Sequence, residues 1–200
     1  MKKDILRLGI ALALFAAGAC VALALVYTVT GPTIAGHERE MLQASLKDIF
    51  PDADSFEPIE RGLESGSPDV TVSGAWRAAR GDATLGVAVK AVASSYGGDA
   101  VMIVGVATDR RIAGARVMTL SDTPGLGANA TNLTYFVDKA AKKTFPGQFT
   151  GKLVGDPFEV KNDVVAISAS TITSKALTSI VKEAGQAGSS WLESNAGGKR

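Results

Sequence analysis

Residues 100–107 read Ala-Val-Met-Ile-Val-Gly-Val-Ala, a nearly continuous run of β-branched and apolar residues. Residues 84–89, Thr-Leu-Gly-Val-Ala-Val, alternate along the chain before this run, and residues 112–120 form another apolar run after it. These patterns predict strands. Residues 96–99 (Tyr-Gly-Gly-Asp) and 109–111 (Asp-Arg-Arg) have the chemistry of turns. The runs 100–107 and 112–120 are therefore expected to form an antiparallel pair.

Helical patterns lie mainly towards the ends of the chain. Residues 34–50 carry apolar side chains at spacings of three and four and are followed by Pro51, which is expected to stop the helix. Residues 131–143 have mixed helical spacing, and residues 173–187 read as a closing helix. Strands in the middle with helices collected at the chain ends predict an α+β fold, with a mixed, mainly antiparallel sheet and flanking helices.

The other segments are less regular. Residues 52–82 are rich in Gly, Ser, Pro and acidic residues, so loops with at most one edge strand are expected there. Residues 149–152 and 164–167 are each expected to form a short strand. The Gly/Ser/Lys-rich tail from Gly188 onward is expected to fray, apart from Trp191-Leu192.

The segment from Leu8 to Gly36 contains no charged residue and no histidine. Residues 8–29 would form a helix roughly 33 Å long, enough for a hydrocarbon core of about 30 Å. They are predicted to span a membrane, with Thr30-Gly31-Pro32 ending the span. Lys2, Lys3 and Arg7 precede this span. The positive-inside rule therefore predicts that residues 1–7 are cytoplasmic and that residues 30–200 form a domain on the extracytoplasmic, periplasmic side of the inner membrane.

Two other kinds of N-terminal segment were weighed against a membrane span. In a cleaved secretory signal the apolar stretch has about 7–15 residues and ends in a small-x-small site, whereas this run is longer and lacks such an exit. In a lipoprotein signal Cys20, preceded by Ala17-Gly18-Ala19, would be acylated, but the apolar run continues beyond it. Cys20 is interpreted as a small apolar residue within the span.

Composition excludes several classes of site. The chain has 21 Lys and Arg against 20 Asp and Glu, a formal charge of +1, so no nucleic-acid partner is expected. Its single cysteine, Cys20, excludes an internal disulfide, a Cys-ligated zinc site and an iron–sulfur cluster built by this chain alone. Its single histidine, His37, excludes a multi-histidine metal site. Chemistry therefore depends on hydroxyls, carboxylates, backbone amides or a borrowed cofactor.

Two polar segments are candidates for such chemistry. Residues 122–127, Asp-Thr-Pro-Gly-Leu-Gly, form a turn whose glycines let backbone amides approach a ligand closely; a simple turn is the alternative. Residues 168–175, Ser-Ala-Ser-Thr-Ile-Thr-Ser-Lys, place five hydroxyl groups at a helix N-terminus, which suits a phosphate. A hydroxyl-capped helix with no ligand is the alternative there. Spacing alone does not decide between these alternatives.

Taken together, these segments resemble a known family, the G subunit of the Rnf electron-transport complex, which is related to the C subunit of the sodium-pumping NADH:quinone oxidoreductase. The resemblance covers nearly the whole chain and begins with a single span followed by Thr-Gly-Pro-Thr-Ile. The Tyr-Gly-Gly turn precedes the strand at residues 102–106, and residues 122–127 match the family's Glu-Thr-Pro-Gly-Leu-Gly. Residues 149–152 match Phe-x-Gly-Lys, and residues 162–164 lead into the family's flavin-attachment motif.

The resemblance implies an FMN cofactor attached through its phosphate to a threonine in the pattern Ser/Thr-Gly-Ala-Thr-x-Thr-Ser. Ser168 matches the first position and Thr171 the esterified threonine, while the residues alone do not separate Thr171 from Thr173. The chain departs from the pattern at Ala169, Ser170 and Val165, where the family has glycine, alanine and commonly a polar residue. Alanine disfavours the positive φ that glycine adopts easily. The implied cofactor-binding residues are Thr171, Ser168, Ser170, Thr173, Ser174, Lys175, Asp122, Thr123, Pro124, Gly125, Leu126 and Gly127.

The implied function is that of a membrane-anchored electron-transfer subunit, in a complex that couples ferredoxin and NAD electron exchange to ion transport. Its partners would be the other membrane and peripheral subunits, the flavin transferase, and membrane lipid around residues 8–29. No complete reaction is expected from this chain alone. Three alternatives stay open: the C subunit of the quinone reductase, whose chains tend to be longer, a flavin-free scaffold subunit, and an exported module that binds a small anion.

Overall fold

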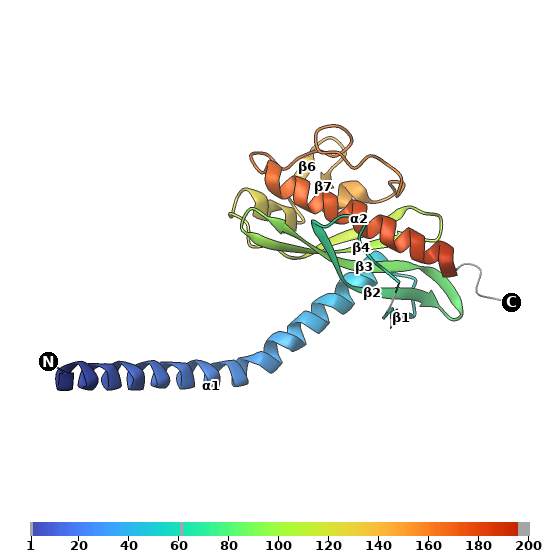
Figure 1. The fold of residues 1–200 in the computed structure, drawn as a ribbon. Helices are drawn as coiled ribbons and strands as arrows, with labels where there is room; N and C mark the ends of the chain where they lie inside the picture. Colours follow the sequence, from blue (N-terminus) through green and yellow to red (C-terminus); the bar gives the residue numbers. More distant parts are fainter. Residues whose placement is uncertain (1, 61, 196–200) are drawn as a thin grey trace. The chain divides into compact units, whose positions relative to one another are not determined.

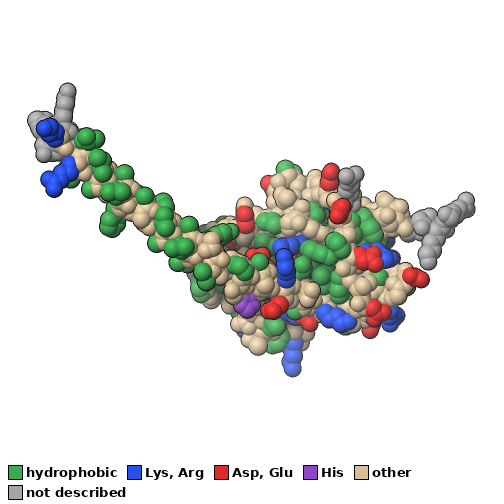
Figure 2. All heavy atoms as spheres, turned by 90° about the horizontal axis from the view of Figure 1, so that it is seen from below, with side chains coloured by type: hydrophobic (Ala, Val, Ile, Leu, Met, Phe, Trp, Pro, Cys, Tyr) green, Lys and Arg blue, Asp and Glu red, His purple; other side chains and the backbone are tan. Residues whose placement is uncertain are grey.

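The computed structural model describes residues 2–60 and 62–195 (Figure 1), and these divide into two compact units between Leu42 and Gln43. Helix α1, Lys2–Ile49, occupies the first unit and extends into the second. Its N-terminal part is long and apolar enough to cross a membrane, with a mean hydropathy of 2.5 in its most apolar window. The hydrophobic side chains along this part are exposed, as Figure 2 shows.

Helix α1 runs without a break through the point where an interruption was predicted. Pro32 lies inside the helix, where its missing N–H cannot donate a backbone hydrogen bond and its ring crowds the carbonyl one turn earlier, yet the helix continues through it. In the turns before it, the hydroxyls of Thr28 and Thr30 donate to the carbonyls of Leu25 and Val26, at 2.8 and 2.9 Å. The predicted helices 8–29 and 34–50 are therefore both confirmed as helical, but as parts of one element that ends at Ile49, before Pro51.

The second unit is built on a five-stranded antiparallel sheet. Strands β3 (Ala83–Ser95), β4 (Gly98–Ala107) and β5 (Ile112–Thr119) follow one another as neighbours and confirm the predicted strands and the antiparallel pair. Strands β1 (Ser55–Pro58) and β2 (Val70–Arg80) complete the sheet in the order β1-β2-β3-β4-β5. With helices at both chain ends, the α+β class is confirmed.

The loops predicted for residues 52–82 are wrong for much of that segment. Strand β2 has eleven residues and pairs with β3 from Val70 to Arg80, with irregularities in register near Gly74 and Ala78. The sequence of this strand mixes Gly, Ala, Ser and Arg with few large apolar residues. Pairing with β3, rather than a local hydrophobic pattern, makes the segment extended.

The two faces of the sheet are covered by the two ends of the chain. Helix α2, Thr171–Asn195, packs Leu177, Ile180 and Ala184 into the core against β3 and β4, as Figure 1 shows. On the other face the end of α1 places Ile49 and Phe50 against Gly86 and Gly105. Successive residues of a strand point to opposite faces of the sheet, so Gly105 faces the end of α1 whereas its neighbour Val106 faces α2.

Helix α2 is longer than the predicted helix 173–187. It continues to Asn195 because Gly188 allows a close approach to Val89 and Val106, and because Trp191 and Leu192 pack against the core. The prediction that the tail frays from Gly188 is therefore wrong as far as Asn195. Residues 196–200 lie outside the described residues.

The segment between β5 and α2 differs most from prediction. It contains the 3₁₀ helices η1 (Gly127–Thr131) and η2 (Pro146–Phe149) and the short strands β6 (Phe136–Asp138) and β7 (Lys143–Thr144). The predicted helix 131–143 is wrong, because residues 136–144 fold back as the β6–β7 pair.

The two short strands predicted in this segment are also wrong. Residues 149–152 end η2 and turn, and residues 164–167 contribute only a bridge from Val164 to Val160. Phe149, Val164 and Ile167 in these segments are buried by tertiary packing rather than by a strand pattern. Phe149 lies between Phe145 and Phe158, with ring centroids 5.5 and 6.2 Å away.

Candidate functional site

A cavity of about 450 Å³ lies beside the first turn of α2. The loop that follows β5 contributes Asp122, Thr123, Leu126 and Gly127 to its wall, and the start of α2 contributes residues 169–173. The two polar segments singled out in the sequence are far apart along the chain, and the fold brings them together here. Tyr96, from the turn between β3 and β4, completes the wall.

Asp122 joins the three parts of this wall. Its carboxylate accepts hydrogen bonds from the Gly97 amide at 2.7 Å, from the Ser95 hydroxyl at 2.8 Å, and from the Thr173 hydroxyl. Burial of the carboxyl by itself raises the pKa of Asp122, but these three donors outweigh burial, so the net pKa is lowered from its ordinary value. Asp122 is therefore an anion at neutral pH that ties the β3–β4 turn and the post-β5 loop to helix α2.

Glycines permit this close packing. A Cβ at Gly127 would lie 2.5 Å from the Thr173 Oγ1 atom and 2.6 Å from Asp122 Oδ2, closer than a real Cβ approaches any atom. A Cβ at Gly97 would clash with the backbone of Ser121. Gly125 adopts a φ of +77°, and its carbonyl accepts a hydrogen bond from the Asn129 side chain. The sequence analysis assigned these loop glycines to ligand approach, and the structure gives Gly127 a packing role against Asp122.

The turn into α2 is held by hydrogen bonds within the chain. The Ser170 amide donates to the Ile167 carbonyl, and both the amide and the hydroxyl of Ser174 donate to the Ser170 carbonyl, at 2.9 and 2.8 Å. The Ser174 hydroxyl also accepts from the Ile167 amide at 3.0 Å. Ala169, between these bonds, has a φ of +57°, in the left-handed region that favours glycine. The hydrogen bonds on both sides hold this alanine in an unfavourable conformation.

Thr171 and Thr173 lie in different environments. Thr173 is 2% exposed, and its hydroxyl is engaged with Asp122. Thr171 is the first residue of α2, is exposed, and lines the cavity. The backbone amides in the first turn of a helix have no partner within the helix and carry the positive end of its dipole. Of the two threonines, Thr171 is thus the one accessible at this positively polarised end.

The remaining predicted residues do not line this cavity. Ser168 is exposed just ahead of the lining run, and Pro124 lies within the loop between Thr123 and Leu126. Ser174 is fully buried, and its hydroxyl is engaged in hydrogen bonds with the backbone of Ile167 and Ser170. Lys175 is exposed and lines a neighbouring cavity of about 580 Å³, together with Asp69 and Asp99.

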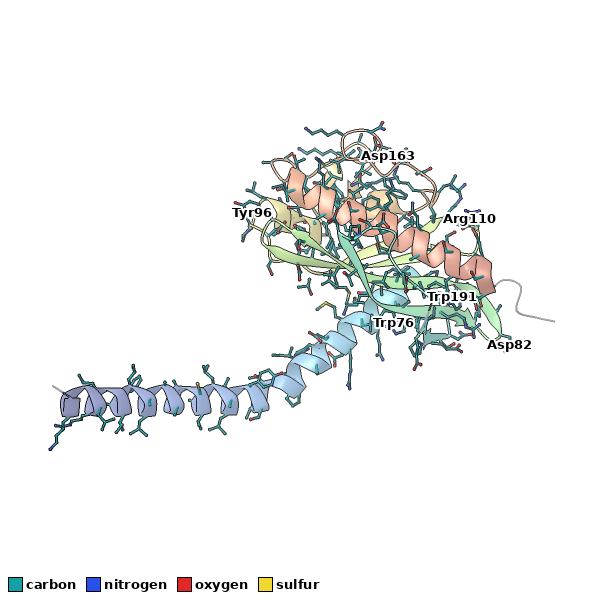
Figure 3. The ribbon with its side chains drawn as sticks, viewed as in Figure 1. Trp76, Asp82, Tyr96, Arg110, Asp163 and Trp191 are labelled. Carbon is teal, nitrogen blue, oxygen red and sulfur yellow. The ribbon has the colours of Figure 1, made fainter. Side chains whose placement is uncertain are left out.

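Three lining residues, Tyr96, Ala169 and Ile172, were not among the predicted site residues, and of these only Tyr96 lies outside the two predicted segments. It is 69% exposed and lies at the sheet end labelled in Figure 3. The signal that was available is its position immediately before a Gly-Gly turn, which the sequence analysis used only as a turn. Its exposed ring adds apolar surface to the cavity wall, and exposed apolar patches often mark ligand sites.

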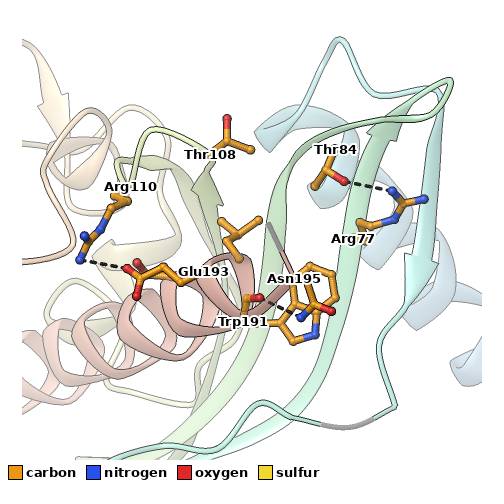
Figure 4. A pocket seen from close by; sticks show the side chains of 9 residues that line it. Arg77, Thr84, Thr108, Arg110, Trp191, Glu193 and Asn195 are labelled. Carbon is orange, nitrogen blue, oxygen red and sulfur yellow. Dashed lines mark hydrogen bonds and ion pairs between the residues drawn. The ribbon is translucent and has the colours of Figure 1, made fainter. Parts of the chain in front are cut away.

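Another cavity, of about 370 Å³, lies by the last turns of α2, where Trp191 and Glu193 contribute to its wall (Figure 4). Its two arginines are paired: Arg77 with Glu57 at 2.9 Å, and Arg110 with Glu193 at 3.2 Å. None of the sequence-predicted site residues lines this cavity. It is therefore separate from the site at the start of α2.

Two family models match separate parts of the chain. Residues 1–49 match the family model of the RnfG N-terminal region, and residues 95–186 match that of the FMN-binding domain. The second match includes Tyr96, the post-β5 loop and the first turns of α2.

Named relatives cover most of the chain. The G subunit of the proton-translocating ferredoxin:NAD(+) oxidoreductase complex of Clostridium ljungdahlii is 32% identical over 171 residues, covering 82% of this chain and 80% of that protein. The G subunit of the Na(+)-translocating complex of Acetobacterium woodii is 30% identical over 190 residues, covering 88% of each chain. The crystal structure of Shewanella oneidensis NqrC matches 72% of this chain at 14% identity, with a TM-score of 0.46. On the identity and coverage of the first two relatives, the chain belongs to the family of G subunits of Rnf-type ion-translocating oxidoreductase complexes and contains its FMN-binding domain.

Proposed function

We propose that this chain is a membrane-anchored electron carrier whose FMN is linked through its phosphate to the hydroxyl of Thr171. The observation that carries the proposal is the position of Thr171, an exposed threonine at the first residue of α2 on the wall of the 450 Å³ cavity. The family's attachment pattern aligns its esterified threonine with this residue. Thr173, the other candidate, has its hydroxyl committed to Asp122.

The surroundings of Thr171 fit a phosphate ester. A phosphodiester carries a negative charge, which the amides and dipole at a helix N-terminus stabilise. Lys175 lies four residues further along α2, hence on the same face of the helix, and adds a positive charge one turn away. Asp122, although anionic, has its carboxylate oxygens engaged by three donors of the protein.

The bound flavin would supply reversible uptake and release of electrons, and the protein's residues would hold it in place. Gly97 and Thr173 both donate hydrogen bonds to Asp122. These bonds hold the turn between β3 and β4 in place relative to the first turn of α2, where Thr171 lies. Ser170 and Ser174 hold the turn from which Thr171 emerges. A covalent link keeps the cofactor on the protein even where dilution would remove a dissociable flavin.

The proposed setting is an Rnf-type complex that couples ferredoxin and NAD electron exchange to ion transport. Relatives named as subunits of such complexes support association with other membrane subunits. The apolar part of α1 supports a single-span anchor in the inner membrane, contacted by lipid around residues 8–29. Attachment of the flavin requires a flavin transferase as a further partner.

The test uses the chain purified from its native membranes. We expect a flavin-fluorescent band after denaturing electrophoresis, and one FMN phosphoester on Thr171 in peptide mass spectrometry across residues 162–182. Thr171→Ala is expected to give a dark band, because it removes the nucleophilic oxygen. Thr171→Ser keeps a hydroxyl at the same place and is the matched control for changes in the fold.

Two results would contradict the proposal. A dark wild-type band with an unmodified peptide would favour the flavin-free scaffold, since the chain would reach its membrane without a cofactor. A phosphoester found on Thr173 or Ser168 would keep the flavin but refute the assignment to Thr171. Circular dichroism of Thr171→Ala, matching wild type, shows that a dark band reflects the missing hydroxyl rather than unfolding.

A further inference from the structure

Three exposed apolar side chains lie on the wall of the 450 Å³ cavity. Tyr96 is 69% exposed, Ile172 57% and Leu126 40%, and all three line the cavity. Exposed apolar side chains that converge on one cavity from three separate segments indicate a site for an apolar ligand. Ile172 directly follows Thr171, so a group attached to Thr171 lies next to one of these apolar side chains.

Tyr96 is held in place relative to Thr171 by a short chain of contacts. The amide of Gly97, the next residue, donates to Asp122 at 2.7 Å, and the Asp122 carboxylate accepts from Thr173, two residues after Thr171. Gly97 also lies so close to Ser121 that a Cβ would clash with its backbone. Tyr96 therefore lies on a turn that is tied to the first turn of α2 and lines the same cavity as the attachment point, although its side chain is largely exposed.

The neighbouring cavity offers a different environment. Its lining includes Asp69, Asp99 and Lys175, so charged groups approach it from β4, α2 and the segment before β2. Ile172 borders both cavities, so Tyr96 and Leu126 distinguish this wall from the neighbouring one. A large planar aromatic ring packed against the charges would strip them of water, whereas packing against Tyr96 and Leu126 buries only apolar surface. A ring linked to Thr171 is therefore expected to lie in the 450 Å³ cavity rather than in the neighbouring one.

We propose that Tyr96 is a positioning residue for the flavin: its phenol ring stacks on the isoalloxazine ring, which lies in the 450 Å³ cavity between Tyr96, Leu126 and Ile172. This inference rests on the proposed attachment of FMN to Thr171. Offset stacking of aromatic rings is a favourable geometry, and the stacked position covers the apolar surface that the protein leaves exposed. An electron-rich phenol in contact with the isoalloxazine ring quenches its fluorescence.

The experiment compares the flavin fluorescence of the full chain in detergent before and after denaturation. Denaturation separates the ring from Tyr96, so fluorescence after denaturation measures how much flavin is attached, whereas native fluorescence measures stacking. For Tyr96→Leu we expect the ratio of native to denatured fluorescence to rise severalfold with unchanged flavin content, and the visible absorption band of the flavin to shift. Leu133→Ala, which alters another exposed apolar residue, is the control and should leave both signals at the wild-type value.

Tyr96→Phe keeps an aromatic ring but donates electrons less readily, so its ratio should also rise while the absorption band stays near that of wild type. This variant decides the matter if Tyr96→Leu loses flavin or fold. Flavin content at the wild-type level with an unchanged ratio in both variants would overturn the role of Tyr96 and leave the attachment at Thr171 standing. A wild-type chain that is dark after denaturation would overturn both proposals.

Discussion

Ala169 combines an ordinary side chain with an unfavourable backbone conformation. Its φ of +57° lies where an L-residue is strained by contact between Cβ and the following carbonyl, and glycine is not. We expect Ala169→Gly to stabilise the domain by about 0.5–1 kcal/mol, less than the full relief of strain because glycine also gains freedom in the unfolded chain. Thermal unfolding of the full chain in detergent measures this.

Ala166→Gly, three residues earlier, provides the control for that substitution. Ala166 is not among the residues with a positive φ, so the same change there should lower stability by roughly 0.5–1 kcal/mol. An Ala169→Gly variant that melts below wild type would mean that the turn depends on the methyl group of Ala169. The sequence singled out this position as a departure from the family's pattern, but only the backbone angle shows that Ala169 adopts a conformation that favours glycine.

The lowered pKa of Asp122 predicts that the folded protein loses stability in acid. Because its pKa is lower in the folded protein than the ordinary 3.8, the ionised group stabilises the fold fully above that value, and the stabilisation is lost as pH falls through the folded pKa. Asp163 contributes in the same direction, through its lowered pKa and its 2.9 Å ion pair with Lys152. Asp122→Asn should therefore be less stable than wild type at neutral pH, by about 1.5–3 kcal/mol for weakened hydrogen bonds to a charged group, and the difference should shrink in acid.

Denaturant unfolding of both proteins between neutral pH and pH values below 3.8 checks this dependence. The remaining acid sensitivity of Asp122→Asn is expected to come from Asp163, so the double variant with Asp163→Asn should lose still more of the pH dependence. A constant difference between wild type and Asp122→Asn across this range would show that the Asp122 carboxyl titrates alike in the folded and unfolded states.

Among the helices and strands, those with a clear local hydrophobic pattern could be predicted from the sequence. Strands β3, β4 and β5 carry continuous or alternating apolar residues, and the predicted helix 173–187 lies within α2. Strand β2 was missed because its Gly, Ala, Ser and Arg residues gain extended structure from pairing with β3. Residues 131–143 were misassigned because their apolar spacing reflects tertiary packing of turns and short strands rather than one helical face.

The candidate site could also be predicted only in part, because only some of its residues stand out in the local sequence. The segments 122–127 and 168–175 were found from hydroxyls, glycines and a family resemblance, and the fold brings both to one cavity. The separation of Thr171 from Thr173 depends on the hydrogen bond to Asp122, a contact between residues 51 positions apart. Lys175 lines the neighbouring cavity and Tyr96 lines this one, because the direction of side chains in three dimensions decides which residues form a cavity wall.

The contact between the end of α1 and the sheet depends on glycines. A Cβ at Gly105 would lie 2.9 Å from the Phe50 ring and closer still to Ile49, in a fully packed part of the sheet. We expect Gly105→Ala to destabilise the domain by about 1–3 kcal/mol through overpacking. Gly155→Ala is the matched control, because a Cβ there meets nothing within 4 Å and its φ is not positive. Equal melting temperatures for the two variants would show that Ile49 and Phe50 move aside at little cost.

At the scale of the whole molecule, the N-terminal charges predict its orientation in the membrane. Lys2, Lys3 and Arg7 precede the apolar part of α1 with Asp4 as the only acidic residue among them, so the positive-inside rule predicts that this end lies in the cytoplasm and that the FMN-binding domain lies on the other side of the membrane. The single native cysteine, Cys20, is first replaced in a Cys20→Ala background. We then expect Ser190→Cys, at an exposed position of α2, to react with a membrane-impermeant maleimide in spheroplasts, whereas Leu6→Cys, which leaves Lys2, Lys3 and Arg7 in place, reacts only after lysis. The reverse labelling would place the domain in the cytoplasm, where the flavin would exchange electrons with cytoplasmic partners. Labelling of Ser190→Cys on a chain whose mature form lacks Met1–Arg7 would instead indicate a cleaved signal, because a spanning helix keeps its charged N-terminal residues.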